Sequence, residues 1–215
     1  MNKYFYKNVP RHFINKFCAV RDPFDNLANL LVIADVVNYS EAAQVNGSED
    51  DFDFAIFSGS YSRALIKKEG GYFSMAFPFQ IINHGDRISL SCDYKRWEVD
   101  GLFVSIMRSA INDAKKGNIS HDEFVLSISD TYDIDTAMSI EYFGTFLKLI
   151  CDDHGYFRFD DDPDNENGDL HPRYHFDFFY KNGSSIKIGY NGEVDIECFY
   201  SFFDSARPKK YIAQD

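Results

Sequence analysis

The sequence predicts an α+β fold, an antiparallel sheet with helices packed mainly on one face, in a single domain. Predicted strands and helices come in blocks and not in strict β-α-β alternation, which is typical of this class. Hydrophobic residues make up 45% of the 215 residues and aromatic residues 17%, which excludes a disordered chain and suffices for a large core. Within 1–215 we expect a helical N-terminal part (1–45), a middle of strands and helices (51–155) and a C-terminal β-meander (156–215).

The N-terminal half begins with apolar residues at helical spacing, which predict helices over 10–20 and 27–39. The period then changes to two, and alternating apolar residues predict strands over 52–56 and 72–82. Pro78 lies inside the second strand and has no amide hydrogen to donate. We therefore expect that strand at a sheet edge or interrupted by a bulge.

The middle of the chain carries helix signals with clear starts. Apolar residues on one face predict a helix over 100–116. Ser120 and Glu123 have the pattern of a capping box, in which each side chain bonds the other residue's backbone amide. A further helix begins after a cap at Asp135 or Thr136. Four apolar residues of that helix are expected to face inward: Ile140, Phe143, Leu147 and Ile150.

The C-terminal third contains short predicted strands and one ambiguous segment. Alternation predicts strands over 156–160, 172–180 and 186–190, with a hairpin turn signalled by Asn-Gly at 182–183. The segment 194–204 alternates at first and then becomes continuously apolar. Both a strand and a buried helix fit it.

Successive side chains of a strand point to opposite faces, so residue parity sorts the C-terminal strands into an aromatic face and a polar face. If these strands pair, seven polar residues gather on the open face of the sheet: Arg158, Asp160, His171, Arg173, His175, Asp177 and Lys187. The two histidines are the unusual members, because two of the six in the chain lie within five residues.

This face has the residue types needed for phosphodiester cleavage. Two imidazoles that titrate near neutral pH can act as general base and general acid, and cationic side chains can bind the phosphate. We therefore predict five catalytic residues, His171, His175, Arg173, Arg158 and Asp160, and two substrate-binding residues, Lys187 and Asp177. We expect no metal and no cofactor.

Two other interpretations of the face stay open. His171 and His175 could join Asp160 or Asp177 around a divalent metal. Alternatively the face is solvated and its charges pair with one another, with Pro172 extending the chain at a strand entry.

The acidic loop at 160–169 invites comparison with an EF-hand calcium loop. Asn165 stands where that loop requires glycine, and His171 stands where it requires a bidentate glutamate. We expect a solvated loop, and whether it binds a cation stays open.

The C-terminal quarter contains three patterns in order: Arg-x-Asp at 158–160, His-Pro-x-x-His at 171–175 and an aromatic run at 198–203. In this respect the segment resembles a family of uncharacterised bacterial proteins known only as a domain of unknown function. The resemblance implies an accessory protein of mobile elements and defence islands, with a toxin–antitoxin or anti-phage role.

The charge balance points to a different class of function. With 22 Lys+Arg against 34 Asp+Glu, the net charge of -12 opposes nucleic-acid binding except through a local basic patch. It suits a basic protein partner, such as the product of a neighbouring gene in the operon. The alternative to an enzyme is therefore a catalytically inert acidic binding protein: an antitoxin, an immunity or regulatory subunit, or a DNA mimic.

The lengths of the apolar runs and the spacing of the cysteines indicate the cellular compartment. The sequence has neither an apolar run of about 18 residues nor a stretch of signal-peptide length, so we expect a cytoplasmic protein without a membrane partner. The four cysteines are spread along the chain and are expected to be free thiols.

Overall fold

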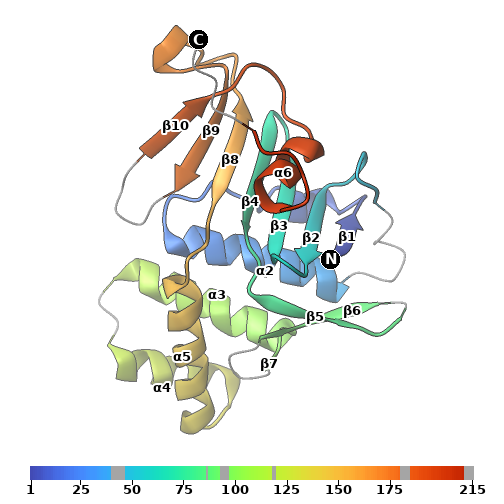
Figure 1. Ribbon diagram of the computed structural model, residues 1–215. Helices are drawn as coiled ribbons and strands as arrows, with labels where there is room; N and C mark the ends of the chain where they lie inside the picture. Colours follow the sequence, from blue (N-terminus) through green and yellow to red (C-terminus); the bar gives the residue numbers. More distant parts are fainter. Residues whose placement is uncertain (40–46, 86, 93–96, 118–119, 180–184, 211–215) are drawn as a thin grey trace. The chain divides into compact units, whose positions relative to one another are not determined.

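The computed structural model describes residues 1–39, 47–85, 87–92, 97–117, 120–179 and 185–210, which form two units (Figure 1). Unit 1 comprises residues 1–8, 45–76 and 155–215, and unit 2 comprises residues 9–44 and 77–154. Helices and antiparallel sheets are both present, so the predicted α+β class is confirmed. The units do not follow the three expected parts of the chain, because each is assembled from separate segments. The single domain stays a prediction.

Unit 1 is built on an antiparallel sheet that has seven strands in the described part of the chain (Figure 1). In spatial order these are β1 (Asn2–Tyr6), β2 (Phe54–Ser58), β3 (Arg63–Lys68), β4 (Gly71–Ala76), β8 (Phe157–Asp161), β9 (Tyr174–Phe179) and β10 (Ser185–Gly189). The strands predicted over 156–160, 172–180 and 186–190 correspond to β8, β9 and β10, which pair in chain order, and the range 156–215 also contains the helix α6 (Ile196–Phe203). The expected hairpin turn at 182–183 lies outside the described residues.

Helix α6 (Ile196–Phe203) covers one face of this sheet (Figure 1). Phe199 lies with its ring centroid 4.9 Å from that of Phe57, and Phe202 lies 5.5 Å from Phe176. Asp195 caps the helix by accepting a hydrogen bond from the amide of Cys198 at 2.9 Å. The ambiguous segment is therefore a buried helix, and its aromatic side chains complete the core of unit 1.

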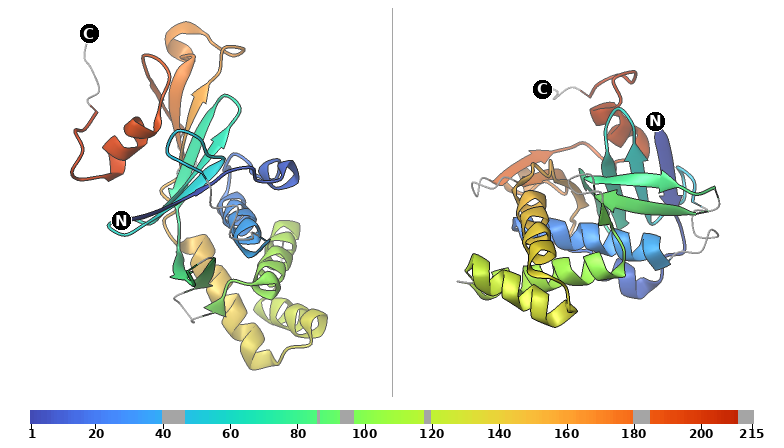
Figure 2. Two further views of the ribbon diagram at one scale, coloured as in Figure 1. Left: turned by 90° about the vertical axis from the view of Figure 1, so that its right-hand side faces the viewer. Right: turned by 90° about the horizontal axis from the view of Figure 1, so that it is seen from below.

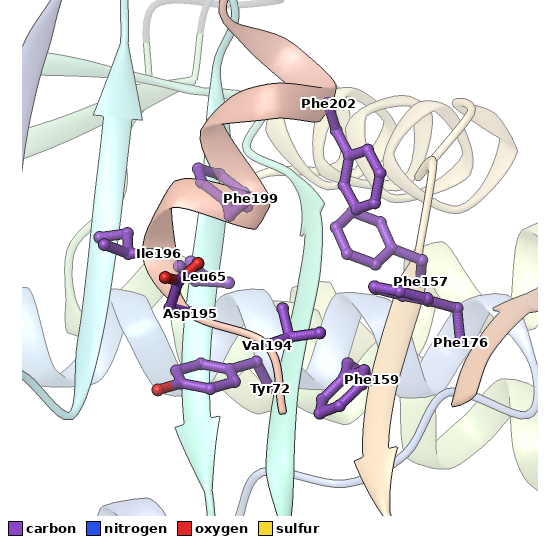
Figure 3. A pocket seen from close by; sticks show the side chains of 10 residues that line it. All are labelled: Leu65, Tyr72, Phe157, Phe159, Phe176, Val194, Asp195, Ile196, Phe199 and Phe202. Atoms are coloured by element: carbon purple, nitrogen blue, oxygen red, sulfur yellow. The ribbon is translucent and has the colours of Figure 1, made fainter. Parts of the chain in front are cut away.

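The contact between α6 and the sheet leaves a cavity of about 20 Å³, which is room for about one water molecule (Figure 3). Ten residues line it: Leu65, Tyr72, Phe157, Phe159, Phe176, Val194, Asp195, Ile196, Phe199 and Phe202. A small-molecule site needs some hundreds of Å³. This face is thus a packed core and not a ligand pocket.

Arg63 of β3 fixes the end of α6. Its side chain is buried, with the guanidinium carbon 4.3 Å from the ring centre of Phe203. Its Nε donates to Ser74 Oγ at 3.0 Å, and its Nη2 donates to the carbonyl of Gly155 at 2.6 Å. The cation is therefore stabilised by an aromatic face and two oxygen acceptors.

Unit 2 is mainly helical (Figure 2). Its described elements are α1 (Arg11–Ile14), α2 (Pro23–Tyr39), β5 (Phe79–Asn83), β6 (Ile88–Cys92), β7 (Trp97–Glu98), α3 (Gly101–Lys116), α4 (His121–Tyr132) and α5 (Thr136–Cys151). Helix α2 contacts α3, α5 and β6, and ten of its residues are buried, which explains its nearly continuous apolar sequence. The strands β5, β6 and β7 form a small antiparallel sheet.

Two predicted elements of the N-terminal half are corrected by the structure. The expected strand over 72–82 is broken at Pro78, so that β4 ends at Ala76 in unit 1 and β5 begins at Phe79 in unit 2. The expected helix over 10–20 shrinks to the single turn α1. Phe13, Phe17 and Val20 are still buried, so the apolar spacing reflects burial and not a continuous helix.

The expected inward face of α5 is also wrong in part. Ile140 and Leu147 are 45% and 40% exposed, whereas Tyr142, Phe146 and Leu149 are buried. Apolar residues surround most of this helix, so their spacing fits more than one face.

The capping box at the start of α4 is confirmed. Ser120 Oγ accepts a hydrogen bond from the amide of Glu123 at 3.2 Å, and Glu123 Oε2 accepts one from the amide of Ser120 at 2.9 Å.

Replacing Ser120 by alanine removes one acceptor, so we expect it to lower the free energy of unfolding by about 1 kcal/mol in urea titrations. The control is Ser127→Ala on the exposed face of the same helix, which should change that free energy by less than about 0.5 kcal/mol. Equal effects of the two changes would contradict the prediction.

Candidate functional site

The polar face of unit 1 lies on three neighbouring strands. Asp160 of β8 stands opposite His175 of β9, and Arg158 stands opposite Asp177. On the other side of β9, Lys187 of β10 also stands opposite Asp177. Directly opposite residues of an antiparallel pair share a face. The five residues that parity predicted on these strands are therefore brought together.

Ion pairs connect this polar face. Arg158 Nη2 lies 2.6 Å from Asp160 Oδ2 and 2.8 Å from Asp177 Oδ2, and Lys187 Nζ lies 3.0 Å from Asp177 Oδ1. Burial alone would lower the pKa of the Arg158 guanidinium, but the carboxylates, Asp160 above all, raise it above its ordinary value. Arg158 is thus a permanent cation shared by two carboxylates.

His175 is not on an open surface, which corrects the sequence-based expectation. His175 is 0% exposed, and its Nδ1 lies 2.7 Å from the carbonyl oxygen of Pro172. A carbonyl only accepts, so Nδ1 carries the hydrogen. Pro172 can reach over the ring because the residue opposite His175 in β10 is Gly189, where an added Cβ would lie 3.0 Å from Pro172 Cγ.

The Nε2 atom of His175 points at the carboxylates. It lies 3.5 Å from Asp160 Oδ2 and 3.8 Å from Asp177 Oδ2. Both separations are too long for a normal hydrogen bond, and this buried nitrogen has no hydrogen-bond partner in the described part of the chain. Buried imidazole nitrogens are usually satisfied, so this one calls for an explanation.

His171 is the accessible imidazole of the face. Its side chain is 31% exposed, its Nε2 lies 3.2 Å from Asp162 Oδ2, and its ring centroid lies 4.9 Å from that of His175. Asn165 Nδ2 donates to both oxygens of Asp162, and these bonds with the one to His171 lower the pKa of that carboxyl. The acidic loop thus uses Asp162 to hold His171.

Arg173 departs from the predicted face. Its Nε and Nη2 donate to the two oxygens of Asp161 at 2.7 and 3.3 Å, and its guanidinium carbon lies 4.9 Å from the ring centre of Tyr174. The bond from Arg173 lowers the pKa of Asp161. Asp161 and Tyr174 are paired and share the aromatic face. Because β9 begins only at Tyr174, strand parity does not extend to Arg173.

Sequence reasoning missed Asp162. Its signal was available, because Asp162 has the same parity as Asp160 and follows directly on β8. Asp162 is not predicted as a site residue because it stands in a run of acidic residues, which is typical of a solvated loop.

Unit 2 contains a larger hollow of about 350 Å³. It is lined by Val37, Asn38, His84, Arg87, Ile88, Ser89, Glu98, Asp100 and Gly101. None of the polar side chains among these residues is buried, and His84 Nε2 bonds Ser89 Oγ at 2.8 Å. The face of unit 1 is therefore the stronger candidate site.

The chain matches no protein-family model, no curated protein and no solved structure. The resemblance to the bacterial family therefore stays a prediction. In the described residues, no helix combines the length and the apolar character needed to cross a membrane.

Proposed function

We propose that the polar face of unit 1 cleaves phosphodiester bonds in a nuclease-like reaction. The observation that supports this most is the pair formed by Asp162 and His171. The carboxylate holds Nε2 of the ring, while Nδ1 has no hydrogen-bond partner among the described residues. A carboxylate that orients an imidazole leaves the other ring nitrogen ready to exchange a proton with the substrate.

The neighbouring groups have supporting roles in this reaction. Arg158 and Lys187 are the cations that would stabilise charge on the phosphate, and His175 supports the ring of His171 by edge-to-face contact. Among the described residues of the face, three carboxylates (Asp160, Asp162 and Asp177) outnumber these two cations. An anionic substrate therefore needs further positive charge here.

His171→Ala tests the proposal directly. Five substrates are assayed, each in MnCl₂ and in EDTA: fluorophore-labelled single-stranded DNA, double-stranded DNA, single-stranded RNA and double-stranded RNA, and the small ester bis(p-nitrophenyl) phosphate. We expect the full chain to cleave at least one of them. The variant should lose about 100-fold or more of that activity, because proton transfer contributes about 10²–10⁴-fold to such reactions. The free energy of unfolding should change by less than about 1 kcal/mol, since the ring is partly exposed.

The matched control is His84→Ala, another exposed histidine, which lies in unit 2 and outside the proposed machinery. It should keep the full activity. Absence of cleavage by the unmodified chain on all five substrates would overturn the proposal, as would an active His171→Ala chain.

The second candidate is an acidic binding protein without catalytic activity, and the net charge of -12 favours it. Expression in a bacterium separates the two. Growth arrest by the unmodified chain and not by His171→Ala supports the enzyme in a toxin–antitoxin or anti-phage setting. Stoichiometric recovery of a basic partner together with an inactive chain supports the binding protein.

A further inference from the structure

We propose that Asp160, His175 and Asp177 bind one divalent metal ion. Each residue offers one ligand atom, and the three atoms lie within 4.8 Å of one another. The residues come from two paired strands and stand two positions apart in the register, on one face of the sheet. Strands of a packed sheet hold such donors more rigidly than a loop does.

The unsatisfied nitrogen of His175 is the observation that points to an ion. The side chain is 1% exposed, and its Nε2 faces two carboxylate oxygens without a hydrogen bond. In the neutral ring, the hydrogen on Nδ1 that is donated to the carbonyl of Pro172 leaves a lone pair on Nε2, which faces the same space as the carboxylates. Histidine ligands of metals are oriented in this way, with the second ring nitrogen donating to a carbonyl or carboxylate.

The spacing of the donors suits a small cation. Ions of the zinc type bind nitrogen and oxygen at about 2.0–2.2 Å, which places tetrahedral ligand atoms about 3.3–3.6 Å apart. His175 Nε2 lies 3.5 Å from Asp160 Oδ2 and 3.8 Å from Asp177 Oδ2. The ligand atoms of the two aspartates lie within 4.8 Å of each other, so binding of the ion requires the donors to move closer together.

Arg158 is compatible with this ion. Each carboxylate oxygen has two lone-pair directions, so the oxygens of Asp160 and Asp177 can accept from Arg158 Nη2 and still face the ion. Because Arg158 and Lys187 already balance the two carboxylates, the ion would add net positive charge to the face. One imidazole with two carboxylates favours Mn²⁺ or Zn²⁺ over Ca²⁺, which takes oxygen ligands.

The role of the ion rests on the proposed function, whereas its binding does not. A bound divalent ion acts as a Lewis acid on a phosphoryl oxygen and on water. It would supply the positive charge that this face lacks, next to the ring of His171. A bound ion here would differ from the metal-free site that the sequence predicts.

Metal binding by the full chain tests the inference without any substrate. Chelator-treated protein is titrated with MnCl₂, followed by electron paramagnetic resonance, and with ZnCl₂, followed by calorimetry. We expect one equivalent to bind and to raise the melting temperature. The Asp160→Asn and Asp177→Asn chains should bind at least 10-fold more weakly, whereas Asp161→Asn, a control on the same strand, should stay within about threefold of the unmodified chain.

A spectroscopic measurement on the unmodified chain covers the case in which a variant fails to fold. Coupling of Mn²⁺ to one imidazole nitrogen should appear in the spin-echo spectrum, and its absence would overturn the assignment. Unchanged affinity in both asparagine variants would overturn it too. Cleavage that persists in EDTA refutes the role of the ion in the reaction and keeps the proposed function, whereas site-specific binding without cleavage refutes the function and keeps the metal site.

Discussion

Truncation of Phe176 to alanine is expected to lower the free energy of unfolding by about 3–5 kcal/mol, the usual cost for a buried phenylalanine. Phe176 is 5% exposed and lies in the centre of the aromatic core, with ring centroids of Phe159 at 5.2 Å, Phe202 at 5.5 Å and Tyr190 at 5.8 Å. It also borders the small cavity under α6. Loss of the ring would enlarge that cavity, because β8, β9 and α6 cannot all close on it.

Phe202→Ala is the matched control, because Phe202 contacts Phe176 but is 40% exposed. We expect it to cost less than half as much in urea titrations that follow circular dichroism. Equal losses for the two variants would show that the core is not centred on Phe176.

Replacement of Arg158 by methionine is expected to cost about 2–4 kcal/mol of folding free energy. Removing one partner of a buried ion pair typically costs about 3–5 kcal/mol, and the residual exposure of these side chains, 21–24%, reduces that figure. Methionine keeps most of the apolar stem, so the loss reports on the two carboxylates left without their shared cation. The measurement is urea unfolding in EDTA.

Two further variants test whether the free-energy cost of Arg158→Met comes from the lost ion pairs. Arg207→Met breaks the exposed pair between Arg207 and Glu197 and should cost less than about 1 kcal/mol. Adding Asp160→Asn to the Arg158 variant removes one uncompensated charge, so the double change should cost less than the sum of the two single changes. A strictly additive result would mean that the pair does not couple.

Strand parity predicted most of the candidate site. It placed Arg158, Asp160, His175, Asp177 and Lys187 on one face, and the register confirms that arrangement. Parity is reliable here because the opposite face carries aromatic residues, and a slip of one residue would turn all of them outward.

Parity could not predict what happens beyond the strand ends. Arg173 precedes β9 and turns to Asp161, and Pro172 returns over His175. Both depend on the path of a loop whose sequence is mostly polar. Burial of His175 therefore follows from tertiary contacts, including the missing side chain at Gly189, that no local pattern encodes.

The larger omissions of the fold have similar causes. Strand β3 (RALIKK) shows no alternation because its first four residues, which point alternately to the two faces of the sheet, are all buried. Pro78 predicted an irregularity, but the passage of the chain from one sheet to another depends on the partners of β5.

The pairing of β4 with β8 imposes an order on biosynthesis. Tyr72 pairs with Phe159, which is synthesised 87 positions later. All of unit 2 has left the ribosome before Phe159 does. Until then β4 is an edge with its aromatic neighbours uncovered, since α6 comes later still. Closing so long a loop is slow, and it leaves the nascent chain open to chaperones and to self-association. Completion of the sheet and of its polar face therefore follows the synthesis of all of unit 2.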